Sequence, residues 1–367
     1  MSVDPAHSLG DSFDLSSQGD AALFHGSTGE PRAIRDKLWI QEVNIQREIK
    51  RHWKEISSYV TSALRTTGLN DVEAEEMAIF PGMEELSAMM YVNQYLREKT
   101  YDVVVLDCAP TAESLRFISL PTTLDWYMKH VFTLQRRVMK AVRPLLNTLG
   151  PIEAPPDSYF GNIQSLFQKI EGIDTVLEDP NVTSVRLVTN AERMVLRETQ
   201  RAFVYFSLHG LCVDGIIVNR VLPDEVTDSF FDGRRAAQQQ ILGEIESYFA
   251  PVPVSKAPLF QNEVLGEAGL TRLAEQLYRD GADPAKITRT DKAYEFAAGS
   301  NGAFEVRVRM PFVQKGEIGL FKKNDELVVE IGTIRRHIGL PTTMSAMTPS
   351  KARMERDMLV VELRNTA

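Results

Sequence analysis

The chain has 367 residues, which is long for one ordinary domain and predicts a large domain followed by a small one. Apolar residues make up 43% and charged residues 25%, a globular composition that excludes wholesale disorder. The net charge of −9 argues against a broad nucleic-acid-binding surface, and two cysteines are too few for a disulfide framework and suit a reducing compartment.

No apolar run approaches the roughly 20 residues that a membrane helix needs, so we expect no transmembrane segment. The first residues lack the basic and apolar regions of a signal peptide. These features predict a cytoplasmic protein.

Three stretches have the apolar spacing of amphipathic helices. The first runs from 31 to 65, the second from 84 to 98, and the third from 124 to 149. The apolar face of the third stretch is Leu124, Met128, Val131, Leu134, Val138, Val142, Leu145 and Leu149. Such a face is most often packed in a core, so the spacing alone does not indicate a binding groove.

Short runs that are apolar on both faces predict buried strands of a parallel sheet at 101–107, 186–189 and 215–219, with a weaker candidate at 252–254. Helical stretches lie next to each run, which is the pattern of an α/β domain. Thr189 and Glu192 fit a capping box that opens the following helix.

The composition changes after residue 278. Residues 279–302 are polar and rich in turn formers, and we expect a linker there. Beyond it apolar residues alternate with period two at 304–310, and 326–331 and 358–363 are further strand candidates. The predicted domains are therefore an α/β domain at 1–278 and a small antiparallel sandwich at 303–367.

Two acidic residues follow short strands. Asp107 ends the run 101–107, at the edge where α/β proteins bind ligands, and such an acid can hold Mg²⁺. Asp4 precedes a proline, and its carboxylate can orient an attacking water. Taken alone, Asp107 is explained as well by a cap on the next turn, and for Asp4 a simple turn is the better explanation.

Residues 4–13 and 107–116 together resemble switch I and switch II of the ATPase family that includes the arsenite-pump and tail-anchored-protein-targeting ATPases. The likeness continues in the same order through 117–127, 191–199, 217–223 and 258–266, and so covers residues 1 to about 278. It implies a mostly parallel P-loop-NTPase-type sheet with flanking helices. Residues 304–364 look like an α-crystallin-like sandwich, which a subgroup of this family carries at its C-terminus.

The resemblance also implies roles for particular residues. Asp4 would be the catalytic acid, and Asp107, Pro110 and Thr111 would form the Mg²⁺-associated switch II. The nucleotide contacts would be Glu192, Asn219 and Pro258. From the residues alone, a capping role for Glu192 and a turn-forming role for Asn219 are the simpler interpretations.

ATP and Mg²⁺ are the cofactors that the resemblance implies, in a homodimer with nucleotide at its interface. It further implies a groove for a hydrophobic or membrane-protein client. The groove residues would include Leu124, Met128, Val131, Val138 and Val142.

The sequence departs from the family pattern most clearly in having no glycine-rich P-loop, the element whose backbone amides and lysine hold the phosphates. We therefore expect the first strands of the sheet to be missing, the chain as written to be inactive, and Met1 to be an internal start within a longer gene. A natural P-loop-less relative is the alternative.

Three smaller departures concern switch II and the metal ligands. Thr111-Ala112-Glu113 stands where the family has Thr-Gly-His, so the switch would respond differently to hydrolysis. Residues 230–235 contain no Cys-x-x-Cys pair, so we expect no zinc. Cys108 and Cys212 are too few for the three-thiolate arsenite site of the pump.

The sequence therefore predicts a dimeric ATPase that couples its nucleotide state to binding of a hydrophobic client, in the cytoplasm or, in a plant, the plastid stroma. A nucleotide-independent chaperone or interaction protein is the alternative, and the missing P-loop favours it for the chain as written. A partitioning or nitrogenase-type relative shares the architecture but would not explain the segment 120–126 or the sandwich.

Overall fold

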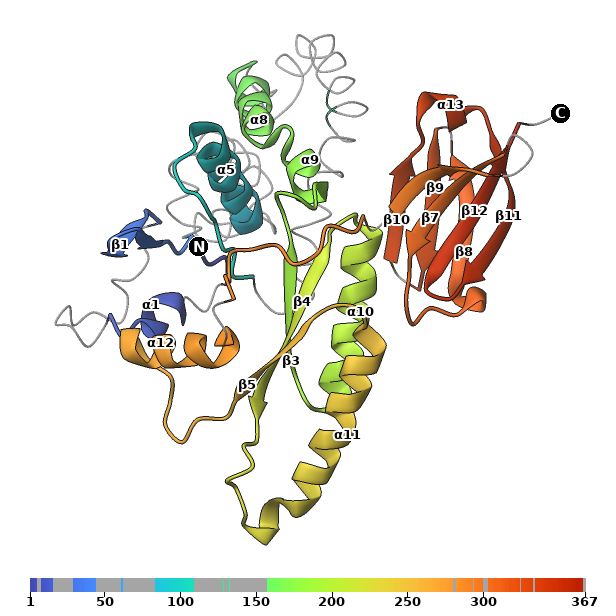
Figure 1. The fold of residues 1–367 in the computed structure, drawn as a ribbon. Coiled ribbons are helices and arrows are strands. Elements are labelled where there is room, and N and C mark those ends of the chain that lie inside the picture. The colour runs from blue at the N-terminus through green and yellow to red at the C-terminus, as the bar shows by residue number, and fades with distance from the viewer. Residues whose placement is uncertain are drawn as a thin grey trace. The chain divides into compact units, whose positions relative to one another are not determined.

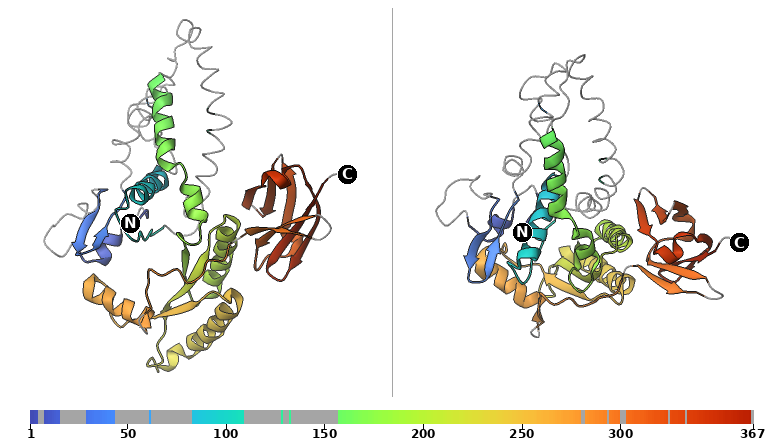
Figure 2. Two further views of the ribbon diagram at one scale, coloured as in Figure 1. Left: turned by 45° about the horizontal axis from the view of Figure 1, so that its top comes forward. Right: turned by 90° about the horizontal axis from the view of Figure 1, so that it is seen from above.

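A computed structural model describes residues 1–4, 8–15, 29–43, 61, 83–108, 128, 132, 157–279, 282–292, 294–299, 303–323, 325–332 and 334–365. They belong to two compact units, one of residues 1–174 with 264–271 and one of 175–263 with 272–367 (Figures 1 and 2). Pro110, Thr111 and the groove residues Leu124, Val131, Val138 and Val142 lie outside the described residues. None of the described helices is long and apolar enough to cross a membrane.

The first unit contains a small parallel arrangement built around residues 1–3. This segment lies between residues 41–43 and residues 105–107, and Ser2 forms parallel bridges to Glu42 and Asp107. The backbone hydrogen bonds run from Ser2 N–H to Gln41 O (2.8 Å), Val43 N–H to Ser2 O (3.1 Å), Val3 N–H to Asp107 O (3.0 Å) and Asp107 N–H to Met1 O (2.8 Å). Of the strand predicted at 101–107, pairing is present only at the carboxyl end, and the predicted burial is wrong, because Val103 is 53% and Val105 is 73% exposed.

The helix predicted from 31 to 65 is wrong at its start. Strand β1 (Arg32–Arg35) and strand β2 (Leu38–Ile40) form an antiparallel pair instead. Lys37 in the connecting turn has a φ of 59°, which a helix does not allow. Leu38 fitted the helical spacing by coincidence, because a hairpin also brings apolar residues back at short intervals.

Two longer helices of the first unit pack against each other. Helix α5 (Met83–Glu98) confirms the helix predicted at 84–98, and it lies against α8 (Asp157–Ile170). Asn93 Nδ2 donates to Lys169 O at 2.6 Å, and Arg97 Nη2 donates to Glu171 O at 2.9 Å. These side chains satisfy carbonyl groups that the end of α8 leaves without helical partners.

The second unit begins with a parallel sheet in the order β3-β4-β5. Its strands are β3 (Val185–Asn190), β4 (Val213–Val221) and β5 (Val254–Pro258), which confirms the first two predicted strands and places the third slightly later. Helices α10 (Arg193–Leu208) and α11 (Asp232–Phe249) connect them and lie side by side on one face (Figure 1). Ile216, Val218 and Ile245 are fully buried in between, as expected for a sheet covered by helices.

The connection between the sheet and the C-terminal strands is fastened to the start of β3 and β4. Arg186 Nη1 donates to Pro284 O at 2.5 Å, and its Nη2 donates to Lys286 O at 3.0 Å. The fully buried Asp214 accepts the Thr288 N–H at 3.0 Å and pairs with Arg186 at 3.4 Å. We call these five residues the Arg186 clasp.

The C-terminal strands form two antiparallel sheets, in the orders β11-β12-β7-β6 and β10-β9-β8. Their bounds are β6 (Tyr294–Ala298), β7 (Phe304–Arg309), β8 (Ile318–Lys323), β9 (Glu326–Ile331), β10 (Ile334–Gly339), β11 (Thr348–Glu355) and β12 (Met358–Arg364). The predicted sandwich is confirmed, and β6 adds an edge strand where the sequence predicted an irregular linker. The predicted boundaries at residues 278 and 303 stay a prediction.

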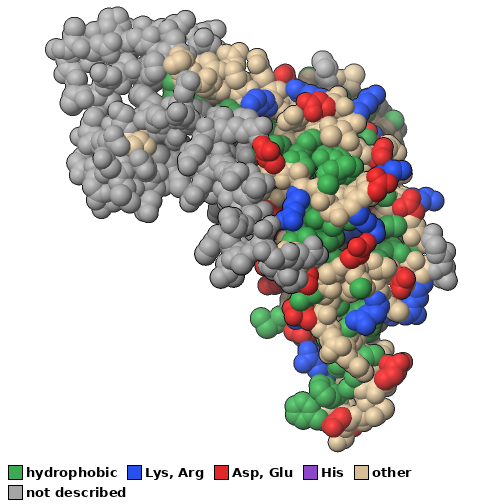
Figure 3. Space-filling model, turned by 90° about the vertical axis from the view of Figure 1, so that its left-hand side faces the viewer, with side chains coloured by type: hydrophobic (Ala, Val, Ile, Leu, Met, Phe, Trp, Pro, Cys, Tyr) green, Lys and Arg blue, Asp and Glu red, His purple; other side chains and the backbone are tan. Residues whose placement is uncertain are grey.

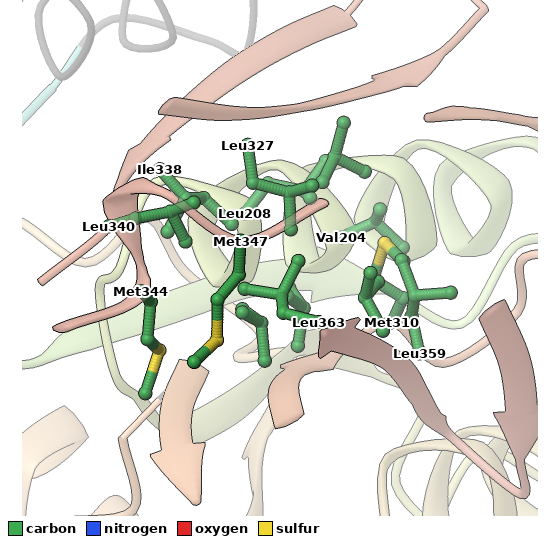
Figure 4. Packing of buried hydrophobic residues seen from close by; sticks show 14 residues of the cluster. Val204, Leu208, Met310, Leu327, Ile338, Leu340, Met344, Met347, Leu359 and Leu363 are labelled. Carbon is green, nitrogen blue, oxygen red and sulfur yellow. The ribbon is translucent and has the colours of Figure 1, made fainter. Parts of the chain in front are cut away.

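Helix α10 contributes to the core of this sandwich. Val204 and Leu208 pack with Val306, Leu327 and Leu359 in one buried cluster (Figure 4). Leu208 has no exposed surface. A helix that covers the parallel sheet therefore also supplies part of the hydrophobic core of the sandwich.

A buried polar cluster lies beside this shared core. Arg336 on β10 donates to Glu178 Oε1 at 2.6 Å, and Tyr294 on β6 donates to Glu178 Oε2 at 3.0 Å. Glu178 ends the short helix α9 (Ile173–Glu178). His209, the C-cap of α10, lies 3.4 Å from Arg336 and stacks on Tyr205. These four residues connect α9 and α10 with β6 and β10 of the sandwich. We call Glu178, Arg336, Tyr294 and His209 the docking cluster.

Candidate functional site

In the first unit, Ser2 connects the two acids that the sequence singled out. The Ser2 hydroxyl donates to Asp107 Oδ2 at 3.1 Å and accepts the Asp4 N–H at 3.2 Å. Ser2 is 1% exposed, whereas the Asp107 side chain lies at the surface. The parallel segments thus bring the backbone of Asp4 and the Asp107 carboxylate to the same serine, and nothing in the sequence identified Ser2.

A third carboxylate lies at the same edge. Glu42 follows Gln41 in the segment paired with Ser2, and its Oε1 accepts the Gly10 N–H at 2.9 Å. Gly10 belongs to the short helix α1 (Ser8–Ser12), which begins four residues after Asp4. Glu42 is 5% exposed, and the sequence-based prediction missed it.

The oxygen atoms at this edge suit a hard divalent cation. Asp107 offers an exposed carboxylate whose Oδ1 is left free by the Ser2 hydroxyl, and Mg²⁺ prefers such oxygen ligands together with water. Within the described residues, no group of three or more His, Cys, Asp or Glu side chains comes together closely enough to hold a metal alone.

In the second unit, Asn219 and Pro258 lie at the carboxyl ends of adjacent strands. Asn219 is opposite Asn190 in the parallel register, and Pro258 is opposite Val221. Asn219 Oδ1 accepts the N–H of Arg220, whose φ is 54°. The side chain therefore has the turn-forming role that the residues alone suggested, while its Nδ2 has no partner among the described residues and can donate to a ligand.

Glu192 is the N-cap of α10, but its side chain makes no capping hydrogen bond. The predicted capping box is wrong, because Thr189 is buried and accepts a hydrogen bond from the Thr199 hydroxyl at 2.7 Å. The Glu192 carboxylate instead lies 3.4 Å from Arg234 Nη2, at the start of α11, and both side chains are exposed. Glu192 is therefore accessible to a ligand.

The two cysteines differ in environment. Cys108 is exposed and directly follows Asp107 in the first unit, whereas Cys212 is buried in the second. Burial raises the pKa of the Cys212 thiol, which makes it a poor thiolate ligand.

The face shown in Figure 3 carries acidic and basic side chains intermingled. Its described part has no continuous basic surface of the kind that binds nucleic acid, in keeping with the net charge.

Comparison with known proteins adds the family. Residues 1–279 match the model of the anion-transporting ATPases, and residues 301–363 match that of the HSP20-like domain found in ArsA. A protein of Aquifex aeolicus named arsenical pump-driving ATPase 1 is 41% identical over 98% of this chain and 91% of its own length. A similarly named protein of Chlorobaculum tepidum is 34% identical over 96% of this chain and 85% of its own. ATPase get3 of Schizosaccharomyces pombe is 27% identical over 76% of this chain and 81% of its own. The chain belongs to the anion-transporting ATPase family, in the subgroup that carries a C-terminal HSP20-like domain.

Proposed function

We propose that the protein is a homodimeric, cytoplasmic ATPase whose nucleotide state controls the binding of a hydrophobic client. The observation that carries the proposal is that the Ser2 hydroxyl binds both the Asp107 carboxylate and the backbone N–H of Asp4. Family membership supports the same conclusion, since nucleotide and Mg²⁺ use is general among these ATPases.

In this proposal Asp4 accepts a hydrogen bond from the attacking water. This bond directs a lone pair of the water oxygen toward the terminal phosphate. Ser2 holds the Asp107 carboxylate through Oδ2, and Asp107 would hold Mg²⁺, directly or through water. The chemistry that Mg²⁺ would supply there is neutralisation of charge on the phosphate oxygens. Pro110 and Thr111 follow in the sequence as the switch that senses the phosphate.

The nucleoside contacts that family membership implies are Glu192, Asn219 and Pro258. Asn219 Nδ2 donates to an acceptor on the base, since Oδ1 is already used by Arg220. The exposed Glu192 carboxylate accepts from the ribose hydroxyls, and Pro258 packs against the base.

The test is ATP hydrolysis by the full-length protein in the presence of Mg²⁺. Asp4→Asn should lower kcat by about 10²- to 10⁴-fold, the usual contribution of a positioned base, while nucleotide affinity measured by calorimetry changes little.

The matched control is Asp11→Asn, which changes an exposed acid on α1. It should leave kcat within about twofold of the parent value. Absence of nucleotide binding would contradict the proposal and favour a nucleotide-independent chaperone.

The dimer and the client are tested separately. Light scattering should show a dimer in the presence of ATP and Mg²⁺. An apolar peptide should then bind in a nucleotide-dependent way, and charged substitutions at Val131 and Val138 should weaken its binding.

A further inference from the structure

Glu42 is a buried carboxylate that the proposed mechanism does not use. Glu42 is 5% exposed. Within the described residues, its carboxylate accepts a hydrogen bond from the Gly10 N–H at 2.9 Å. Burial of a carboxylate is costly unless hydrogen bonds compensate for the lost water. A leucine or methionine at this position would avoid that cost, so the carboxylate requires a reason.

The segment that carries Glu42 is firmly held. Ser2 pairs with it through two backbone hydrogen bonds. Next to Glu42, the buried Gln41 side chain accepts from Tyr95 Oη at 2.8 Å and donates to Gly29 O at 2.8 Å. Glu42 therefore projects from a fixed support, as a residue that orients another segment must.

The partner of Glu42 is α1, the helix that follows Asp4. Gly10 is the third residue of α1, where a backbone N–H has no helical acceptor and needs one from outside. The α-carbon of Gly10 also faces the carboxylate, since a Cβ added there would lie 3.6 Å from Glu42 Oε1.

Asp4 thus lies between two anchors. On its amino side, its own N–H is held by the Ser2 hydroxyl at 3.2 Å. On its carboxyl side, the chain enters α1 at Ser8, which Glu42 fastens through Gly10. Both anchors start from adjacent parallel segments, so they fix the Asp4 segment relative to Asp107.

We propose that Glu42 is a positioning residue for catalysis: by holding α1 it sets the place from which Asp4 orients the hydrolytic water. The inference rests on the proposed function, because it assigns Glu42 to the same reaction. It adds a residue that never touches the nucleotide and acts through Asp4.

The first test compares Glu42→Leu with Glu42→Gln in the full-length protein. Leucine removes the acceptor for the Gly10 N–H, so kcat should fall by about 10²-fold, the cost of a small misplacement, with the KM for ATP little changed. Glutamine keeps a carbonyl acceptor and should restore most of kcat. Glu98→Leu, at an exposed glutamate of α5, is the control and should behave like the parent protein.

The second test places both changes in one chain. If Glu42 acts through Asp4, then Glu42→Leu should cost almost nothing in the Asp4→Asn background. Multiplicative losses would overturn the inference while leaving the proposed function intact. An Asp4→Asn variant as active as the parent would instead overturn the proposed function.

A third readout does not depend on activity. Backbone amide hydrogen exchange of residues 8–15 should be faster in Glu42→Leu than in Glu42→Gln, and equal rates would overturn the inference. If Glu42→Leu does not fold, Gly10→Pro removes the donor instead, at a position in the first turn of a helix that tolerates proline. It should lower kcat in the same way, again only when Asp4 is present.

Discussion

His209 is a buried histidine that lies beside a buried arginine. Burial, and then the charge of Arg336, lower the pKa of His209 to about 3. The other titratable groups of the docking cluster are Glu178 and Tyr294, and burial followed by the Glu178 carboxylate raises the pKa of Tyr294 to about 12. His209 is therefore neutral in the folded protein at neutral pH, and its Nδ1 can accept from Arg336.

This pKa predicts how stability depends on pH. The unfolded pKa of about 6.5 lies above the folded value, so the unfolded chain binds the proton first as the pH falls. The contribution of His209 is complete above pH 6.5 and is lost progressively toward pH 3, by up to about 1.4 kcal/mol per pH unit. Urea unfolding between pH 7 and pH 5 should show this decline.

The control for that prediction is His209→Gln, which cannot take up a proton. Its free energy of unfolding should depend less steeply on pH than that of the parent over the same range, before the carboxylates begin to titrate. Parallel curves for the two proteins would contradict the assigned role of His209.

Among single residues, the sequence identified those that end predicted strands and missed those that support them. Asp107 was a candidate because an acid after a doubly apolar run is typical of the ligand edge of a sheet, although that run is exposed at Val103 and Val105. Ser2 and Glu42 could not, because their importance comes from hydrogen bonds between segments far apart in the chain. Thr189 misled the prediction, since its hydroxyl pairs with Thr199 rather than with a helix terminus.

Among the elements, α10 serves two parts of the second unit. Its N-cap, Glu192, lies at the carboxyl edge of the parallel sheet, and its last turn lies in the core of the sandwich. No helical pattern in the sequence reveals the second role, because a residue such as Leu208 would be apolar against either partner.

Shortening Leu208 tests that role. Leu208→Ala should lower the free energy of unfolding by about 2–5 kcal/mol, because it leaves a cavity in a fully buried cluster. Met194→Ala on the same helix is the matched control and should change it by less than about 0.5 kcal/mol, since Met194 is 82% exposed. Hydrogen exchange in β7 and β12 should be faster in Leu208→Ala and unchanged in Met194→Ala. That result would show that the substitution in α10 destabilises the sandwich.

The elements also show why local patterns were insufficient in two places. The segment 31–40 has helical spacing but forms a hairpin, because the turn at Asp36-Lys37 overrides it. Strand β6 lies in a polar stretch and is strand only because β7 pairs with it along its whole length.

In the molecule as a whole, the sandwich covers apolar surface of the α/β part. A chain that ends before Ala303 should expose Val204 and Leu208, which are now buried. We expect it to bind a hydrophobic dye more strongly than the full chain and to aggregate at lower temperature. An unchanged dye signal and aggregation temperature would contradict the shared core.

The order of the α/β part and the sandwich along the chain was predictable from the spacing of apolar residues alone. Doubly apolar strands between helices indicated the parallel sheet, and the change to period two after residue 303 indicated the sandwich. The packing of one on the other was not predictable, because each would have formed a plausible independent domain.

The Arg186 clasp has a consequence for how the C-terminal strands can be used. A flexible tether would let the sandwich sample a wide volume and meet a client far from the sheet, at an effective concentration set by tether length. Here residues 284–288 are bound to the sheet that they leave, and Leu208 is bound in the sandwich that they enter. The sandwich is therefore held in a fixed orientation to the strands that carry Asn219 and Pro258.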